Sequence, residues 1–163
     1  SRIDVYNMDL VKRLQDLMHK YDLPLHLLEL EFTETAYTQD SNQMVQMANA
    51  LKTAGFSLDM DDFGSGFASY AYLRHLPLDL LKIDGTFVRG IEHDPINRAM
   101  VGSMVQIARQ LGLRTVAEFV ESAAAQDCLR ELGIDYAQGY FIGRPHPLAE
   151  LPDALAAEPL LPR

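Results

Sequence analysis

The chain has 163 residues, of which 48% are hydrophobic and 23% charged, values typical of a globular domain with enough apolar residues for a real core. Its formal net charge of −9 disfavours non-specific binding to DNA or RNA, so a phosphate-bearing ligand would have to be held by a local device such as metal ions. No apolar run approaches the roughly 20 residues of a membrane-spanning helix, and the first ten residues lack the pattern of a signal peptide. We therefore expect a cytoplasmic protein without a membrane segment.

Five apolar segments are predicted to be buried parallel strands, and segments of helical periodicity alternate with them. In chain order, the pattern predicts a helix at 10–20, a strand at 27–32, a helix at 42–54, a strand at 56–60, a helix at 69–76, a strand at 78–83, a helix at 96–111, a strand at 113–120, a helix at 123–132 and a strand at 134–141. Gly55, Gly112 and Gly133 directly follow three of these helices, where glycine commonly provides the left-handed cap. Such alternation is typical of parallel βα units.

The domain organisation is predicted to be simple. No linker, low-complexity segment or charge run divides the chain, so residues 1–150 are interpreted as one unit and residues 151–163, with three prolines, as a tail that frays. A closed (β/α)₈ barrel typically needs about 250 residues and eight strands. If the fold is a barrel, we expect these residues to form only part of it.

Neither the cysteine nor the histidines form a pattern typical of a zinc site or a nucleophile. Cys128 is the only cysteine, so it cannot form an internal disulfide, and its helical context predicts a buried, inert thiol. The five histidines are scattered without a common spacing. The candidate chemistry therefore depends on other side chains.

Acidic residues gather where the predicted strands end. In parallel α/β folds, the carboxyl ends of the strands meet at one edge, and ligands bind there. Grouped carboxylates would repel one another in a half-buried site unless cations neutralised them, and an all-oxygen set favours Mg²⁺ or Mn²⁺ over zinc. The alternative is a structural network of charged groups. The acids are Glu31, Glu34, Asp61, Asp62, Glu118 and Glu121, and the third and fifth strands add Lys82, Asp84 and Gln138.

A glycine-containing segment, DDFGSGFASY at 61–70, follows the second predicted strand. Gly64 and Gly66 form a GxG pair, which alone is weak evidence for phosphate binding. One interpretation is an ordinary βα turn. The other is a mobile loop that brings Asp62 into a metal site when a substrate or partner binds.

Four segments in order resemble the signature blocks of the EAL family of cyclic di-GMP phosphodiesterases: ELEFTET, DMDDFGSGFASYAYLRHLPLDLLKIDGTFV, LGLRTVAEFVES and GIDYAQGYFIGRP. The resemblance covers the chain from about Ser1 to Pro147. It implies an α/β fold, a TIM-like (β/α)₈ barrel of the EAL type, with at least five parallel βα units present here. It also implies hydrolysis of cyclic di-GMP to pGpG with two divalent cations, Mg²⁺ or Mn²⁺.

The resemblance assigns a role to each matching position. It implies metal ligands at Glu31, Asp61 and Asp62, with Asp61 bridging, and it implies that Glu118 holds a metal-bound water. Lys82 resembles the lysine that contacts the hydrolytic water. Loop support is implied for Glu34, with Gly64 and Gly66, and substrate binding for Glu121, Gln138, Arg144 and Pro145.

The chain also departs from the family pattern. The Glu-Ala-Leu signature and the asparagine expected one strand later, which both supply metal ligands, do not occur, so we expect an N-terminally truncated barrel. Phe119 occupies a position that is usually glycine, where a phenyl ring could crowd the water-binding position or pack outward.

Three functions remain open from the sequence. The first is a portion of a cyclic di-GMP phosphodiesterase whose isolated fragment has little or no activity. The second is a degenerate EAL domain that binds cyclic di-GMP as a receptor, and the third is a regulatory or dimerisation module. In each case we expect an upstream sensory or signalling domain and a homodimer, in which a second copy covers the open barrel edge unless local helices rearrange over it.

Overall fold

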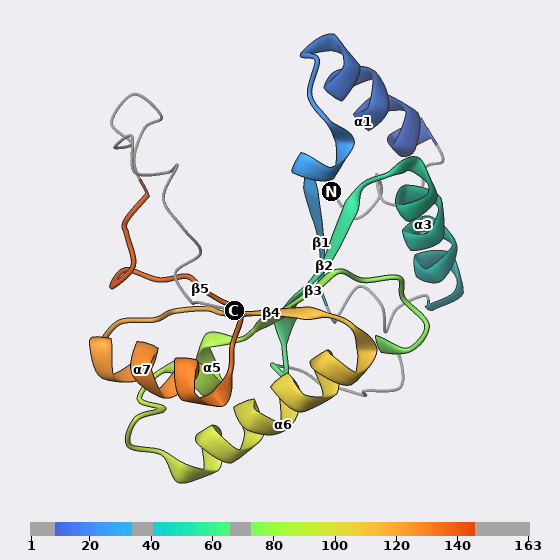
Figure 1. Cartoon of the computed structure of the whole chain (residues 1–163). Helices are drawn as coiled ribbons and strands as arrows, with labels where there is room; N and C mark the ends of the chain where they lie inside the picture. Colours follow the sequence, from blue (N-terminus) through green and yellow to red (C-terminus); the bar gives the residue numbers. More distant parts are fainter. Residues whose placement is uncertain (1–8, 34–40, 66–72, 146–163) are drawn as a thin grey trace. The chain divides into compact units, whose positions relative to one another are not determined.

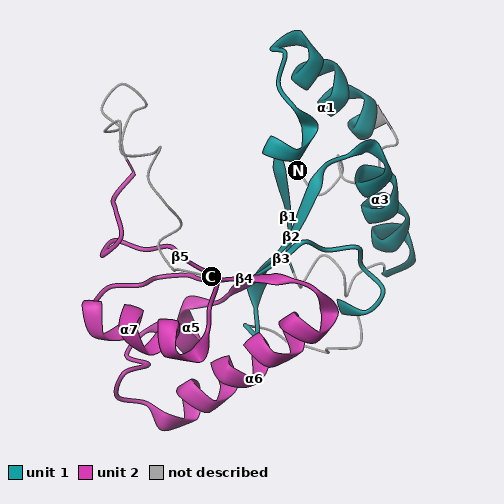
Figure 2. Cartoon of the chain, viewed as in Figure 1, with its two compact units in different colours: residues 1–81 teal, residues 82–163 magenta. Residues whose placement is uncertain are grey.

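The computed structural model of this chain describes residues 9–33, 41–65 and 73–145 (Figure 1). The chain divides into two compact units, Ser1–Leu81 and Lys82–Arg163 (Figure 2), and the boundary falls within a strand. The five strands form one sheet in the order β1-β2-β3-β4-β5. This order confirms the predicted succession of strands.

The first unit contains two α-helices and a pair of parallel strands. It contains α1 (Asp9–Lys20), the short 3₁₀ helix η2 (Leu25–Leu27), β1 (Glu29–Thr33), α3 (Ser41–Ala54), β2 (Ser57–Phe63) and the start of β3 (Leu80–Ile83). The β1–β2 register pairs Glu31 with Asp59 and Thr33 with Asp61. Fully buried Phe56, Leu58, Met60 and Phe63 on and beside β2 form much of its core.

A hydrogen-bonded aspartate fixes the entry to β3. The Asp79 N–H donates to Leu58 O over 2.8 Å, and its carboxylate accepts the Leu58 N–H over 2.9 Å. The same carboxylate contacts the ammonium of Lys52 in α3 at 2.6 Å. These bonds join α3 and the start of β3 to β2. They also satisfy backbone N–H and C=O groups that would otherwise be buried without a hydrogen-bond partner.

The second unit repeats the pairing of strands with helices. It contains the end of β3, α5 (Gly85–Val88), α6 (Pro95–Leu111), β4 (Arg114–Ala117), α7 (Ala123–Leu132) and β5 (Tyr136–Ala137). β4 and β5 are parallel, with Val116 opposite Tyr136, and the Glu118 N–H donates to Ile83 O at the end of β3. Cys128 is buried in α7 as predicted, and burial raises the pKa of its thiol, which keeps it in the poorly nucleophilic protonated form.

The long helices of the second unit begin and end with strong caps. Asp94 accepts the N–H groups of Ile96 and Asn97 at the start of α6, and Ser122 accepts that of Ala125 at the start of α7. The helices end at Gly112 and Gly133, which have φ of 74° and 79°. These left-handed glycine caps confirm the sequence-based prediction of where α6 and α7 end.

The observed strands differ from the predicted ones at both ends. β1 begins at Glu29 in place of 27, after the unpredicted 3₁₀ helix η2, and β3 begins at Leu80 in place of 78. The predicted strand at 113–120 ends at Ala117, and that at 134–141 is only two residues long because residues 139–143 form a hydrogen-bonded turn. The short helix α5 was not predicted, since four residues are too few to show a helical period. The predicted helix at 69–76 lies mostly outside the described residues. No helix in the described part of the chain is long and apolar enough to cross a membrane.

Candidate functional site

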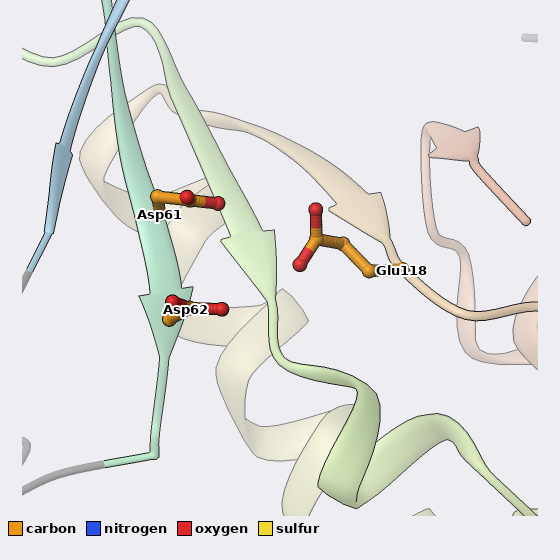
Figure 3. Close-up of side chains that lie close together, drawn as sticks. All are labelled: Asp61, Asp62 and Glu118. Atoms are coloured by element: carbon orange, nitrogen blue, oxygen red, sulfur yellow. The ribbon is translucent and has the colours of Figure 1, made fainter. Parts of the chain in front are cut away.

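Two adjacent aspartates occupy the end of β2 in the first unit. Asp61 and Asp62 are both half-buried, and in Figure 3 their carboxylates extend to the same side of the strand. Neighbouring side chains in a regular strand point to opposite faces. The alternation fails here because Asp62 has a φ of 53°, in the left-handed region. The backbone therefore turns so that two carboxylates become available on one side.

This left-handed turn has a conformational cost that the surrounding backbone offsets. A non-glycine residue in the left-handed region costs about 1–2 kcal/mol, and such strain collects at functional sites. The Asp62 carbonyl accepts the N–H of Ser65 over 3.1 Å, and Gly64 between them has a φ of 98°. Within the described part of this turn, residues 62–65, Gly64 thus provides the second positive φ, a conformation that glycine adopts readily.

A buried ion pair lies where β3 and β4 end in the second unit. Lys82 Nζ lies 2.9 Å from Glu118 Oε1, and the two residues are only 8% and 7% exposed. Lys82 belongs to β3. Glu118 follows β4 directly, as Figure 3 shows. Because a buried charge is very costly without a partner, each of these groups requires the other or an equivalent charge.

The structure describes only one of three further residues that were predicted to belong to the site, Glu31, Glu34 and Gly66. Glu31 lies within β1 and is exposed, and its register partner in β2 is Asp59, a buried acid that the sequence analysis did not select. Asp61 lies opposite Thr33. The role of Glu31 as a metal ligand stays a prediction. Glu34 and Gly66 lie outside the described residues.

A cavity of about 360 Å³ opens in the second unit beside Glu118. Three predicted site residues line it, Glu118, Glu121 and Gln138, and so does Phe119, the departure from the family pattern. Sequence reasoning missed the other three lining residues, Arg89, Gly139 and Tyr140. Gly139 and Tyr140 lie in the AQGY segment that drew attention to Gln138, whereas no sequence signal distinguishes Arg89.

Backbone hydrogen bonds hold two walls of this cavity together. The Val120 N–H donates to Gln138 O over 3.0 Å, and the Phe141 N–H donates to Val120 O over 3.0 Å. A Cβ atom at Gly139 would overlap the backbone of Val120, so only glycine permits this approach. The segment after β4 and the segment after β5 therefore form one rigid lining.

Charged side chains stack on two aromatic rings beside the cavity. The Arg89 guanidinium lies 4.4 Å from the Phe119 ring centroid, and its Nε lies 3.9 Å from Glu121 Oε1. Arg144 lies 4.4 Å from the ring centroid of Tyr140, so it reaches a lining residue without lining the cavity itself. Pro145 follows it and is exposed. The substrate-binding role of this Arg-Pro turn stays a prediction.

Comparison with known proteins identifies relatives and structural neighbours of the whole described fold. The family model for the EAL domain matches residues 1–145. The chain is 48% identical over 129 residues to the cyclic di-GMP phosphodiesterase PdeB of Shewanella oneidensis, which covers 79% of this chain and 15% of that protein. Among solved structures, it matches the PaMucR phosphodiesterase in complex with c-di-GMP with a TM-score of 0.86 and 34% identity, over 93% of this chain and 62% of that one.

A second structural neighbour was solved with both a metal and a nucleotide. The calcium/cy-diGMP complex of Klebsiella pneumoniae BlrP1 matches with a TM-score of 0.82 and 32% identity, over 87% of this chain and 36% of that one. The manganese/cy-diGMP complex of the same protein matches with a TM-score of 0.81. These likenesses confirm the predicted EAL-type, TIM-like α/β fold class.

The chain spans only part of these proteins, between 15% and 22% of the length of the curated relatives it matches. The family match nevertheless extends over most of the chain. It includes Asp61 and Asp62 at the end of β2, Glu118 after β4, and the residues that line the cavity. The chain belongs to the EAL domain family.

Proposed function

We propose that this chain forms part of a cyclic di-GMP phosphodiesterase, in which Asp61, Asp62 and Glu118 (Figure 3) contribute to a divalent-cation site. The observation that carries the proposal is the buried Lys82–Glu118 ion pair, which sits at strand ends of a chain whose relative PdeB is named a cyclic di-GMP phosphodiesterase. A buried lysine and acid at such an edge are typical of a reaction site more than of a solvated surface.

The donor chemistry of these residues fits a hard divalent cation. All three candidate ligands are carboxylates, and none of the three is fully exposed. Mg²⁺ and Mn²⁺ prefer oxygen ligands, whereas zinc and copper sites are usually rich in His or Cys. Bound cations would lower the pKa of a water molecule and neutralise charge on the phosphodiester.

In the proposed reaction, the Lys82–Glu118 pair would position the attacking water and balance charge. The Lys82 ammonium lies 2.9 Å from the Glu118 carboxylate and offsets its negative charge in a position that little water reaches. A lysine ammonium is a donor of up to three hydrogen bonds, and a water molecule or a phosphate oxygen can accept one of them. Lys82 would thereby orient the attacking water and offset part of the anionic charge of the substrate.

Glu121 and Gln138 would recognise the nucleotide. They line the cavity next to Glu118, so a ligand whose phosphate approaches Glu118 could place its base between them. A carboxylate accepts N–H donors, and an amide both donates and accepts, a combination that suits the edge of a guanine base. We include Arg144 and Pro145 as outer parts of this substrate site.

Hydrolysis of cyclic di-GMP tests the proposal. The protein that contains this chain is incubated with cyclic di-GMP and Mg²⁺ or Mn²⁺, and the linear dinucleotide pGpG is quantified by chromatography, with EDTA as the metal-free condition. Asp61→Asn and Asp62→Asn should each lower the rate by about 100-fold or more, because each removes a charged ligand while preserving side-chain volume. Asp127→Asn, an equal change on the exposed face of α7, is the matched control.

Two results would contradict the phosphodiesterase proposal. One is a rate that is indifferent to EDTA and to both aspartate substitutions. The other is tight binding of cyclic di-GMP with no pGpG formed under any metal condition, which would favour the receptor function instead.

A further inference from the structure

Phe119 is an unusual residue in an unusual backbone conformation. It has a φ of 56°, and its side chain is 46% exposed although it is large and apolar. A left-handed backbone is rare for bulky residues and is tolerated when the surroundings determine it. The position follows Glu118 directly and lines the 360 Å³ cavity.

The surroundings hold the ring in one place. A Cβ atom at Gly85 would overlap the Phe119 ring, so the ring packs directly on the first residue of α5. The Arg89 guanidinium, 4.4 Å from the ring centroid, interacts with it through a cation–π contact. The ring thus contacts α5 and the residue that follows α5, while Phe119 as a whole residue is 46% exposed.

The other lining groups complete a surface suited to a planar heterocycle. Tyr140 adds a second exposed aromatic ring, and Glu121 and Gln138 add hydrogen-bonding groups at the edge. Flat rings bind by stacking on aromatic faces, and base edges bind to amide and carboxylate groups. The rigid backbone between the segments after β4 and β5 keeps these groups in register.

We propose that the Phe119 ring is a stacking surface for a guanine base of the bound nucleotide, and that Gly85 is the position that makes room for it. The proposal rests on the proposed function, since it assumes that cyclic di-GMP occupies this cavity. It makes Phe119 a nucleotide-binding residue that is not itself a metal ligand. Loss of one aromatic stacking contact weakens binding of a nucleotide by about 5- to 150-fold.

Affinity and ring-current measurements on matched variants test this inference. Phe119→Leu keeps an apolar side chain and removes the ring, Phe119→Gly also relieves the left-handed backbone, and Phe119→Tyr preserves the ring. Phe141→Leu is the control, since Phe141 is 45% exposed and does not line the cavity. Cyclic di-GMP affinity is measured by calorimetry with Ca²⁺, and the guanine H8 resonance is followed by NMR, with urea unfolding to verify that each variant is folded.

The expected results differ between ring-containing and ring-free variants. Phe119→Leu and Phe119→Gly should weaken binding by at least about fivefold and remove the upfield shift that stacking gives to guanine H8, whereas Phe119→Tyr and Phe141→Leu should stay within about twofold of wild type. Unchanged affinity and an unchanged H8 shift in Phe119→Leu would overturn the inference while leaving the phosphodiesterase proposal intact. Failure of the wild-type protein to bind cyclic di-GMP would overturn both.

Discussion

At the scale of single residues, the candidate site depends on backbone conformations that most side chains avoid. Asp62 and Phe119 are two of the three non-glycine residues with positive φ in the described part of the chain. Each stands within two residues of the end of a strand and next to another site residue. The strain is therefore placed where, under the proposed function, two successive side chains would face one ligand.

The Lys82–Glu118 pair is predicted to matter for stability as well as chemistry. Lys82→Met removes the ammonium 2.9 Å from a buried carboxylate, and breaking such a pair on one side typically costs about 3 kcal/mol. We expect the free energy of unfolding, measured by urea denaturation in EDTA, to fall by about that amount. The double variant Lys82→Met/Glu118→Leu should regain part of the loss, because it removes the Glu118 charge that Lys82→Met leaves without its ammonium partner.

An exposed ion pair provides the control for this measurement. Arg130 and Asp127 form an i,i+3 pair on α7 with side chains 44% and 66% exposed, so Arg130→Met should change the unfolding free energy by less than about 0.5 kcal/mol. A loss for Lys82→Met no larger than the loss for Arg130→Met would show that the pair is not the buried structural anchor described here.

At the scale of elements, the sequence predicted the long periodic helices and did not predict the places where a strand ends early. The long helices α6 and α7 were predictable because their apolar periodicity and terminal glycines are local signals. The early end of β4 was not, since the left-handed turn at Phe119 depends on packing against Gly85, which is 34 residues away in the sequence.

In the candidate site, the sequence likewise predicted several residues but not the contacts between them. Asp61, Asp62 and Glu118 were predictable from their positions at the ends of predicted strands, and Lys82 from its place in the third one. Nothing in the sequence indicated that Lys82 and Glu118 would form an ion pair. Arg89 was missed because its place beside Phe119 and Glu121 depends on the unpredicted helix α5. Tertiary packing, which local patterns do not encode, determines these contacts.

The caps of the second unit give a prediction at this scale. Asp94 accepts the N–H groups of Ile96 and Asn97 at the start of α6, so Asp94→Ala should lower the free energy of unfolding by about 1 kcal/mol. Asp94→Ser, which keeps a capping oxygen, should recover most of the loss. Urea denaturation measures both, and equal stability of Asp94→Ala and wild type would contradict the capping role.

At the scale of the whole molecule, the proposed function depends on groups that lie far apart in the sequence. Asp61 and Asp62 are at the end of β2, and Lys82, Glu118 and the cavity belong to the segments at and beyond the ends of β3 and β4. The proposal requires that divalent cations bind at the carboxylates of Asp61, Asp62 and Glu118. A measurement that locates the metal tests this requirement without relying on turnover.

Paramagnetic broadening by Mn²⁺ is the most direct test of that central claim. Mn²⁺ is titrated at substoichiometric amounts into the isotopically labelled protein, and the backbone amide signals are compared with those of Asp61→Asn. The account predicts selective broadening at Asp61, Asp62 and Glu118, reversed by EDTA and strongly reduced in the variant, because an ion held by these three carboxylates would lie near the backbone amides of the same residues. Broadening confined to other acidic residues, or equal in Asp61→Asn and wild type, would contradict the account.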